Sequence, residues 1–397
     1  MEYIDVYIFW NERYYNEFRK HPIGHIRFIY VKTYSNQFSY SVDEIITEFK
    51  NVFLGNQNIF FVSLWKISIP RNLENTAKSI EQLVYQFNIS RDRIIWSLNE
   101  VTEVFNKKLP IIPILEKYWL KTIPSYKLEN SNFDDFCSFP YVLKADGLTG
   151  WCGMYFIEDK SQLLENIYKL HRKGLDELFL SKYVEGIEIS FSLFRIWDNF
   201  IRLPISFREK TDTKLTHPDE KIKVTWLING FEAEFEKIEK MMKKKNIYGA
   251  FYLEWIINNG VVNYLEWWTR FSGSTSIRLK SMSMYNIFFE ILNYIQWLDV
   301  SHPKIYSISV QYAKYISDSS AINIELLNEI IFESKVENTG ELPYSDKNLT
   351  RMRINYTGEN EDDIITKTHQ IWDIIDDANL SERLNKFFYV LKKINTV

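Results

Sequence analysis

FPYVLKADGLTGWCGMYFI, residues 139–157, is the stretch that decides the fold. Two apolar runs, each typical of a short buried strand, are separated by a turn that contains Gly147, Gly150 and Gly153. Lys144 stands where the first run ends and the turn begins. Glycine N–H groups can approach a phosphate closely because no Cβ intervenes, and a lysine supplies positive charge. The pattern therefore predicts either a loop that binds nucleotide phosphates or a simple β-hairpin.

The composition is that of a soluble globular protein with two or three domains. Of the 397 residues, 46% are hydrophobic and 25% are charged. The formal net charge of -4 gives no general electrostatic basis for binding nucleic acid. Cys137 and Cys152 form no metal-ligand pattern, no apolar run is long enough to span a membrane, and the first residues do not resemble a secretory signal. A cytoplasmic location is therefore expected.

Residues 1–110 are predicted to form an N-terminal open α/β domain, because strand and helix patterns alternate there. The strand patterns lie at 4–10, 26–31, 58–63 and 93–96, and the helical patterns lie at 42–53 and 73–87. A further helical pattern at 99–120 is interrupted by Pro110 and Pro113.

Residues 111–300 form a second region, in which strand and helix patterns are mixed. Besides the opening stretch, strands are expected at 126–128, 178–184, 187–197, 249–257 and 261–267, and helices at 161–173, 230–245 and 284–298. Residues 301–397 are predicted to form a small α+β domain. Its strands are expected at 304–312, 330–334 and 351–356, and its helix at 362–376.

A second candidate site segment is LFLSKYVEGIEIS, residues 178–190. Its strand could offer backbone groups to the edge of an adenine, and Glu188 could accept hydrogen bonds from ribose hydroxyls. The simpler interpretation is a bend with solvated acidic side chains.

A third segment carries two glutamates on one predicted hairpin, in YLEW at 252–255 and YLEWWTRF at 264–271. Alternation places Glu254 and Glu266 on adjacent strands among large apolar residues, where an unpaired carboxylate is costly. A divalent cation shared with substrate phosphates would remove that cost, and so would an ion pair with Arg270. Both interpretations remain open for the isolated hairpin.

Taken in order, the three segments resemble the ATP-grasp ligases, and within them phosphoribosylamine–glycine ligase. The corresponding strings of that enzyme read roughly PVVxKADGLAxGKGV, EExLxGEExS and LEFNxRFG. The run at 351–360, RMRINYTGEN, also resembles its closing domain, where GRVLxVTxxG precedes a helix. The resemblance covers roughly residues 100–376. It implies that residues 111–300 form a two-lobed α+β ATP-grasp domain, whose smaller lobe covers about 120–184.

The resemblance implies an ATP site in this chain. Lys144 would contact the phosphates, and Gly150 and Gly153 would belong to the loop above them. Lys182 and Val184 would lie at the adenine hinge. Glu188 would bind the ribose.

The resemblance also implies a metal site and a reaction. Glu254 and Glu266 would hold Mg²⁺ or Mn²⁺, and Arg270, with Lys144, would be catalytic and face a phosphate or acyl phosphate. The implied enzyme is an ATP-dependent carbon–nitrogen ligase that activates a carboxylate to an acyl phosphate, which an amine then attacks. Its partners would be a small carboxylate and a small amine, with the protein acting as a monomer or homodimer.

Three departures from the family pattern indicate that the substrates differ from those of the family. They also leave two alternatives, an active ligase and an impaired one. Cys152 stands where the family has a second lysine, and Trp268 stands where it has a metal-binding asparagine. The first strand is followed by Phe9 and Trp10 in place of a glycine-rich turn. The alternative function is a catalytically impaired homologue that binds a nucleotide or a partner.

Two polar segments are further candidates for the site. Residues 208–220 are expected to form a loop, with Arg208 and Lys210 as anion contacts. The hydroxyl-rich run at 272–276 would wrap a carboxylate or form a plain loop.

Overall fold

The structure of the protein is a computed structural model. It describes residues 4–9, 19, 25–31, 59–62, 85, 88, 90, 93–95, 104, 107–128, 136, 138–146, 153–209, 220–226, 231–268, 287–296, 307–316, 327, 330–331, 333–342, 345–375 and 379–394. None of the helices in these ranges is long and apolar enough to cross a membrane. The predicted helices at 42–53 and 73–87 lie almost entirely outside the described residues.

The N-terminal strands form a parallel sheet, as the alternating pattern predicts. Its order is β2-β1-β3-β4, and its strands are β1 (Ile4–Phe9), β2 (Ile26–Val31), β3 (Ile59–Val62) and β4 (Ile94–Ile95). Asp5 on β1 is buried and accepts two hydrogen bonds from Arg27 on β2, at 2.6 and 2.8 Å. The mixed α/β fold class is confirmed here.

A second, antiparallel sheet contains the opening stretch, and we call it the small sheet. Its order is β5-β8-β6-β7, with β5 (Ser125–Lys127), β6 (Tyr141–Ala145), β7 (Met154–Ile157) and β8 (Leu178–Lys182). Helix α6 (Lys160–Arg172) begins at Asp159, whose carboxylate accepts a hydrogen bond from the Gln162 amide at 2.9 Å. Its apolar side packs on Tyr141, Leu143 and the other outward residues of the small sheet. Strand alternation therefore turns Val142 and Lys144 to the opposite, inner face.

A nine-stranded antiparallel sheet, which we call the large sheet, forms the rest of the core. Its order is β14-β13-β9-β11-β12-β15-β17-β16, with β10 paired to β9. Its strands are β9 (Ile187–Ile196), β10 (Asn199–Arg202), β11 (Ser206–Arg208), β12 (Glu220–Thr225), β13 (Gly249–Asn258), β14 (Val261–Trp268), β15 (Ile308–Ile316), β16 (Glu333–Leu342) and β17 (Ser345–Gly358). Because β12 pairs with β15, one continuous sheet crosses the predicted domain boundary at residue 300.

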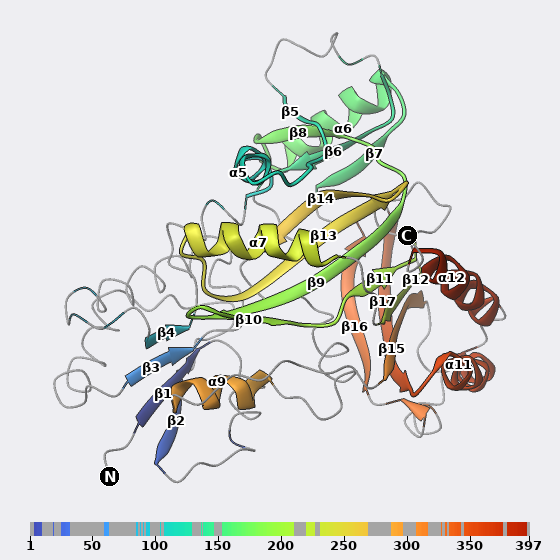
Figure 1. The fold of residues 1–397 in the computed structure, drawn as a ribbon. Helices are drawn as coiled ribbons and strands as arrows, with labels where there is room; N and C mark the ends of the chain where they lie inside the picture. Colours follow the sequence, from blue (N-terminus) through green and yellow to red (C-terminus); the bar gives the residue numbers. More distant parts are fainter. Residues whose placement is uncertain are drawn as a thin grey trace.

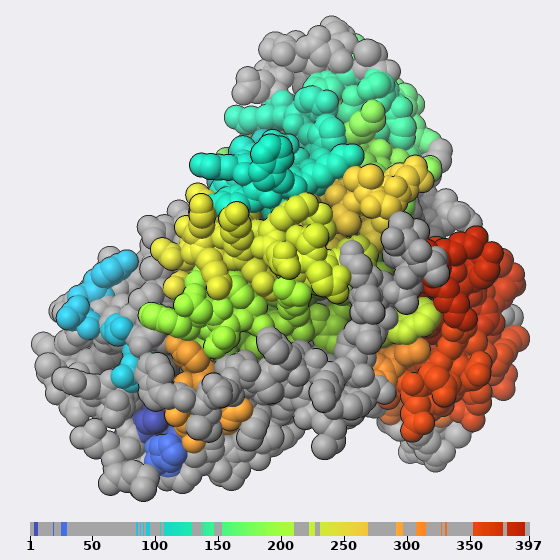
Figure 2. Space-filling model, in the orientation of Figure 1, coloured from blue at the N-terminus to red at the C-terminus, as the bar shows by residue number. Residues whose placement is uncertain are grey.

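The large sheet has one apolar face, which helices cover. Helix α7 (Glu232–Lys244) lies along β9 and β13, and α11 (Glu361–Ile375) and α12 (Leu380–Ile394) lie beside β15 and β17 (Figure 1). Phe191 on β9 contacts Trp255 on β13 and Phe235 on α7, with ring centroids 4.6 and 4.7 Å apart. The small sheet and α5 (Ile112–Lys117) sit above α7 and β14 (Figure 2).

The opposite face of the large sheet is polar over much of its width. Strand register and alternation place together on it Glu188, Ser190, Ser206, Arg208, Lys223, Thr225, Glu254, Ser309, Gln311 and Asn355. Most of these side chains are buried, and the amide of Gln311 donates to Asn355 at 2.9 Å. A buried polar face of this kind is typical of a binding site, because buried polar groups are costly without partners.

Three sequence predictions need correction. The helical pattern at 99–120 is not continuous, because residues 107–111 form a bend and turns between the helical Val104 and α5, and Pro113 lies in the first turn of α5, where proline is tolerated. The strands expected at 304–312 and 330–334 begin later, at Ile308 and Glu333. Helix α12 was not predicted at all. Helix α9 (Ile287–Ile295) falls inside its predicted range.

Candidate functional site

Lys144 lies buried on the inner face of the small sheet. Its backbone is paired with Met154 on β7 and Phe179 on β8, and its ammonium lies 5.8 Å from the centre of the Phe179 ring. Only 3% of the residue is exposed. Desolvation by burial lowers the pKa of Lys144 to about 8, although the neighbouring Glu266 and Glu254 charges oppose this shift. A lysine held in this way is ready to receive an anion.

Lys108 brings a second buried ammonium to the same place, and the sequence analysis missed it. Its Nζ lies 2.8 Å from Oε1 of Glu266, and the two side chains are only 3% and 9% exposed. Its backbone N–H donates to Asp146 Oδ1 at 2.7 Å, so the Lys-Ala-Asp end of β6 anchors it. The only local signal was a lysine just before a proline-interrupted helix. The structure therefore places a cation from a different segment beside Lys144.

Glu254 and Glu266 face each other across β13 and β14, as the hairpin pattern predicts. They are register partners next to a β-bulge. Like charges directly opposite destabilise a sheet, so this pair needs compensating positive charge. Lys108 supplies some of it to Glu266, and the indole N–H of Trp268 donates to Glu266 Oε2 at 3.1 Å.

Glu254 is compensated by a different set of groups. Its Oε1 accepts a hydrogen bond from the Tyr252 hydroxyl and lies 3.7 Å from Nη2 of Arg208. Burial would raise the pKa of Glu254, but the charges of Arg208 and Lys223 and the Tyr252 hydrogen bond outweigh burial and hold it below its usual value. The carboxylate is therefore ionised and able to serve as a metal ligand.

The two glutamates fit a divalent cation that takes its remaining ligands from elsewhere. Among the described residues, no group of three His, Cys, Asp or Glu side chains is close enough to hold a metal ion. Mg²⁺ is commonly bound by one or two carboxylates together with water and substrate phosphates. Glu254 and Glu266 would supply the two carboxylates of such a site.

Glu188 joins the site through Arg208. The two residues are register partners on β9 and β11, and the guanidinium contacts the Glu188 carboxylate. Arg208 was predicted as an anion contact, and the structure places it between Glu188 and Glu254. Lys210 lies outside the described residues.

The segment between β8 and β9 joins the two sheets. The Lys182 amide donates to Pro124 O at 2.9 Å, and alternation turns the exposed Lys182 side chain away from Lys144. Val184 is half-buried, and Asn258 Nδ2 donates to Glu185 O at 2.6 Å. Any adenine contact by Lys182 would therefore use its backbone carbonyl, and the roles of Lys182 and Val184 stay predictions.

A small cavity separates the two sheets at this site. Its volume is about 20 Å³, enough for one water molecule, and Lys108, Lys144, Ser181 and Glu266 contribute to its wall. Backbone contacts between Lys121 and Tyr264 hold the sheets together beside it. The charged groups thus meet in the interior, between the sheets.

Most of the remaining candidate residues are not among those that the structure describes. Arg270, Gly150 and Cys152 lie outside the described residues, as does the run at 272–276. Gly153 has a φ of +70° and its carbonyl accepts a hydrogen bond from the Ala145 amide at 3.0 Å, so it closes the turn before β7. Its contact with a phosphate stays a prediction.

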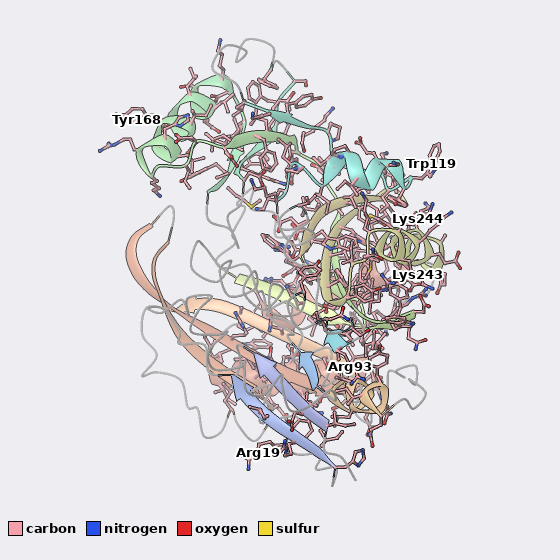
Figure 3. The ribbon with its side chains drawn as sticks, turned by 90° about the vertical axis from the view of Figure 1, so that its left-hand side faces the viewer. Arg19, Arg93, Trp119, Tyr168, Lys243 and Lys244 are labelled. Atoms are coloured by element: carbon pink, nitrogen blue, oxygen red, sulfur yellow. The ribbon has the colours of Figure 1, made fainter. Side chains whose placement is uncertain are left out.

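The outer surface offers a contrast to the buried charges. Tyr168 on α6, Lys243 and Lys244 on α7, and Trp119 just after α5 project outward (Figure 3). The lysine run at 243–245 is exposed at the end of α7.

Comparison with known proteins identifies the fold. No protein-family profile matches the sequence, and no curated protein matches it. Solved structures match over nearly the whole chain. The L-amino acid ligase from Bacillus licheniformis is 14% identical with a TM-score of 0.68, and the match covers 94% of this chain and 98% of that one.

Two further neighbours share this architecture. The N5-carboxyaminoimidazole synthetase from Staphylococcus aureus, complexed with ADP, is 13% identical with a TM-score of 0.66 and covers 92% of this chain and 98% of its own. The biotin carboxylase from Campylobacter jejuni is 14% identical with a TM-score of 0.59, covering 94% and 91%. These neighbours are ATP-grasp enzymes. The chain therefore has the ATP-grasp fold.

Proposed function

We propose that the protein is an ATP-dependent ligase that joins a small carboxylate to an amine through an acyl phosphate. The observation that carries the proposal is the meeting of Lys108 and Lys144 with the facing carboxylates Glu254 and Glu266 between two sheets. Such a set provides what phosphoryl transfer needs, namely fixed positive charge and positioning in a site that excludes water. The fold of the neighbouring ligases supports this interpretation.

Each candidate residue is assigned one role in this proposal, with the roles of Gly150 and Arg270 taken from the family resemblance alone. Lys144 and Lys108 would hold the phosphates of ATP, with Gly150 and Gly153 in the loop over them. Glu254 and Glu266 would hold Mg²⁺ or Mn²⁺, which neutralises phosphate charge when bound. Glu188 would accept the ribose hydroxyls, and Arg270 would face the transferred phosphate.

The substrates are proposed only by class. A carboxylate oxygen attacks the γ-phosphorus of ATP and ADP leaves. An amine then attacks the acyl carbon and inorganic phosphate leaves. The basic part of the polar face, Arg208 and Lys223, lies beside the carboxylate pair and would attract the acid. The resemblance to phosphoribosylamine–glycine ligase supports the type of reaction, whereas the departures at Cys152, at Trp268 and after the first strand favour altered substrates.

The test is nucleotide binding and ADP release by the purified protein. Wild-type protein is expected to bind ATP more tightly with Mg²⁺ present, and to release ADP with a suitable acid and amine from a panel. Lys144→Met and Glu266→Gln should abolish ADP release. Lys243→Met, the same change at an exposed lysine, should not alter it.

A second candidate function is a nucleotide-binding protein without ligase activity. The hydrogen bond from Trp268 to Glu266 favours it, because an indole cannot coordinate a metal as the family's asparagine does. ATP binding without Mg²⁺ dependence, together with no ADP release across the panel, would support this candidate over the first. Absence of any ATP binding would overturn both.

A further inference from the structure

Both oxygens of Glu266 are engaged by donors of the protein itself. Lys108 Nζ lies 2.8 Å from Oε1, and Trp268 Nε1 lies 3.1 Å from Oε2. The opposite carboxylate, Glu254, has Oε1 occupied by the Tyr252 hydroxyl and the Arg208 guanidinium. At least three of the four oxygens of the carboxylate pair are therefore already engaged by donors or cations of the protein.

The site needs no added cation to balance its charge. In the part of the chain that the structure describes, the cations here outnumber the carboxylates that they contact or lie near. The cations are Lys108, Lys144, Arg208 and Lys223, and the carboxylates are Glu188, Glu254 and Glu266. A free divalent cation would enter a site with no net negative charge, next to the Lys108 ammonium. A nucleotide would bring the missing negative charge.

The backbone and the ammonium of Lys108 are held by different groups. The backbone N–H is fixed by Asp146, whereas the ammonium has an ion pair with Glu266 and a contact of 3.8 Å with Met154 Sδ. A phosphate that reached Lys108 would offer the ammonium an equivalent ionic partner. If the ammonium turned to the phosphate, Oε1 of Glu266 would be exposed.

We propose that the Lys108–Glu266 ion pair is a latch that excludes divalent cations from the carboxylate pair until a nucleotide phosphate binds Lys108. Metal and nucleotide binding are then thermodynamically coupled through one carboxylate oxygen, and each strengthens the other. This inference rests on the proposed function, because it takes the nucleotide to be the phosphate donor.

The experiment measures Mn²⁺ binding by electron paramagnetic resonance, with and without ADP, and with Mn²⁺–ADP lacking protein as a reference. Wild-type protein should bind Mn²⁺ weakly alone and about tenfold or more tightly with ADP, within the usual range of coupling between sites. Lys108→Met keeps the apolar stem but removes the charge. It should tighten Mn²⁺ binding to the nucleotide-free protein by about tenfold or more and weaken ADP binding.

Two variants serve as controls. Lys107→Met changes the neighbouring lysine, which is half exposed and lies 3.8 Å from Glu177, and it should leave Mn²⁺ binding unchanged. Lys108→Arg retains the positive charge and should keep Mn²⁺ out of the nucleotide-free protein. Circular dichroism checks that each variant is folded.

The outcomes separate the latch from the proposed function. Tight Mn²⁺ binding to wild-type protein without nucleotide would overturn the latch. So would unchanged nucleotide-free binding in Lys108→Met, even with normal ADP binding. If neither ATP nor ADP binds while Lys108→Met still tightens Mn²⁺ binding, the proposed function fails and the exclusion of metal by Lys108 stands.

Discussion

Lys144 destabilises the folded state, because its charged side chain is buried. Among the hydrogen bonds and ion pairs of the described residues, it has no direct carboxylate partner. Burial lowers its pKa from 10.5 to about 8. One pKa unit corresponds to about 1.4 kcal/mol, so the unfavourable free energy of the charged form is roughly 3 kcal/mol. A bound anion, such as the nucleotide phosphate that we propose, would remove this cost.

The first residue-scale prediction is that Lys144→Met raises the thermal midpoint of the nucleotide-free protein. Methionine has a similar shape and no charge, so the roughly 3 kcal/mol is recovered at about pH 7. Below about pH 8 the lysine is charged in both the folded and the unfolded state, and the full cost is present. Between about 8 and 10.5 only the unfolded state keeps the proton, so the cost falls to zero as pH rises.

Scanning calorimetry of wild-type and variant protein at several pH values measures this difference. The gap between the two midpoints should shrink as pH rises through that window. Lys243→Met, at an exposed helix end, should show no such gap. A Lys144→Met midpoint below that of wild type would contradict the argument.

At the scale of elements, the strands around the site could be predicted from alternation alone. The segments 178–184, 187–197, 249–257 and 261–267 each match a strand closely, because one face of each is apolar and buried. The pairing of Glu254 with Glu266 followed from the hairpin. Helix α12 also had a readable signal in its apolar period, with buried Leu380, Leu384, Phe388 and Leu391.

Other contacts of the site could not be predicted from the sequence. Lys108 reaches Glu266 only because the segment before α5 packs against β14, and no local pattern specifies that packing. Arg208 meets Glu188 through the register of β9 and β11, which depends on the whole sheet. Contacts between distant segments are set by tertiary packing, which periodicity does not describe.

The element-scale prediction concerns the ion pair that attaches α12 to the end of β11. Arg383 on α12 donates two hydrogen bonds to Glu209, at 3.0 and 2.6 Å, and Glu209 directly follows Arg208 of the site. The side chains are 21% and 14% exposed, so loss of one partner leaves a largely buried charge. Arg383→Met should lower the free energy of unfolding by about 2 kcal/mol.

A double-mutant cycle measures the pair. Glu209→Gln combined with Arg383→Met should cost much less than the sum of the single changes, because neither charge is then left alone. Lys386→Met is the matched control, since its ion pair with Glu382 on the same helix is mostly exposed and should contribute at most about 0.5 kcal/mol. If Arg383→Met and Lys386→Met lower the free energy of unfolding equally, Arg383 has no special role in attaching α12.

At the scale of the whole molecule, the site exists only where the two sheets are held against each other. The small sheet supplies Lys144 and the large sheet supplies Glu254 and Glu266, and the chain passes from one to the other through Gly186 (Figure 1). Gly186 has a φ of +143°, and a Cβ placed on it would lie 2.1 Å from Ile257 O. The connection therefore requires glycine for two reasons, its backbone conformation and the close approach of β13.

The whole-molecule prediction is that Gly186→Ala shifts the small sheet relative to the large one. The added Cβ would push β8 from β13 and would strain the bond between Asn258 and Glu185, so the lysines and glutamates would separate. Weaker ADP binding is expected together with a lower thermal midpoint. Gly174→Ala is the matched control, because that glycine also has a positive φ, +72°, but nothing lies within 4 Å of its Cβ position.

Gly174→Ala should cost only about 1 kcal/mol of stability and leave ADP binding unchanged, because its Cβ would meet no neighbouring atom and the change strains only the local backbone. Calorimetric titration of ADP into both variants compares their affinities for ADP. If Gly186→Ala binds ADP as tightly as Gly174→Ala, the position of the small sheet does not depend on this connection. The contacts of Lys121 with Tyr264 and of Lys108 with Glu266 would then be what aligns the two halves of the site.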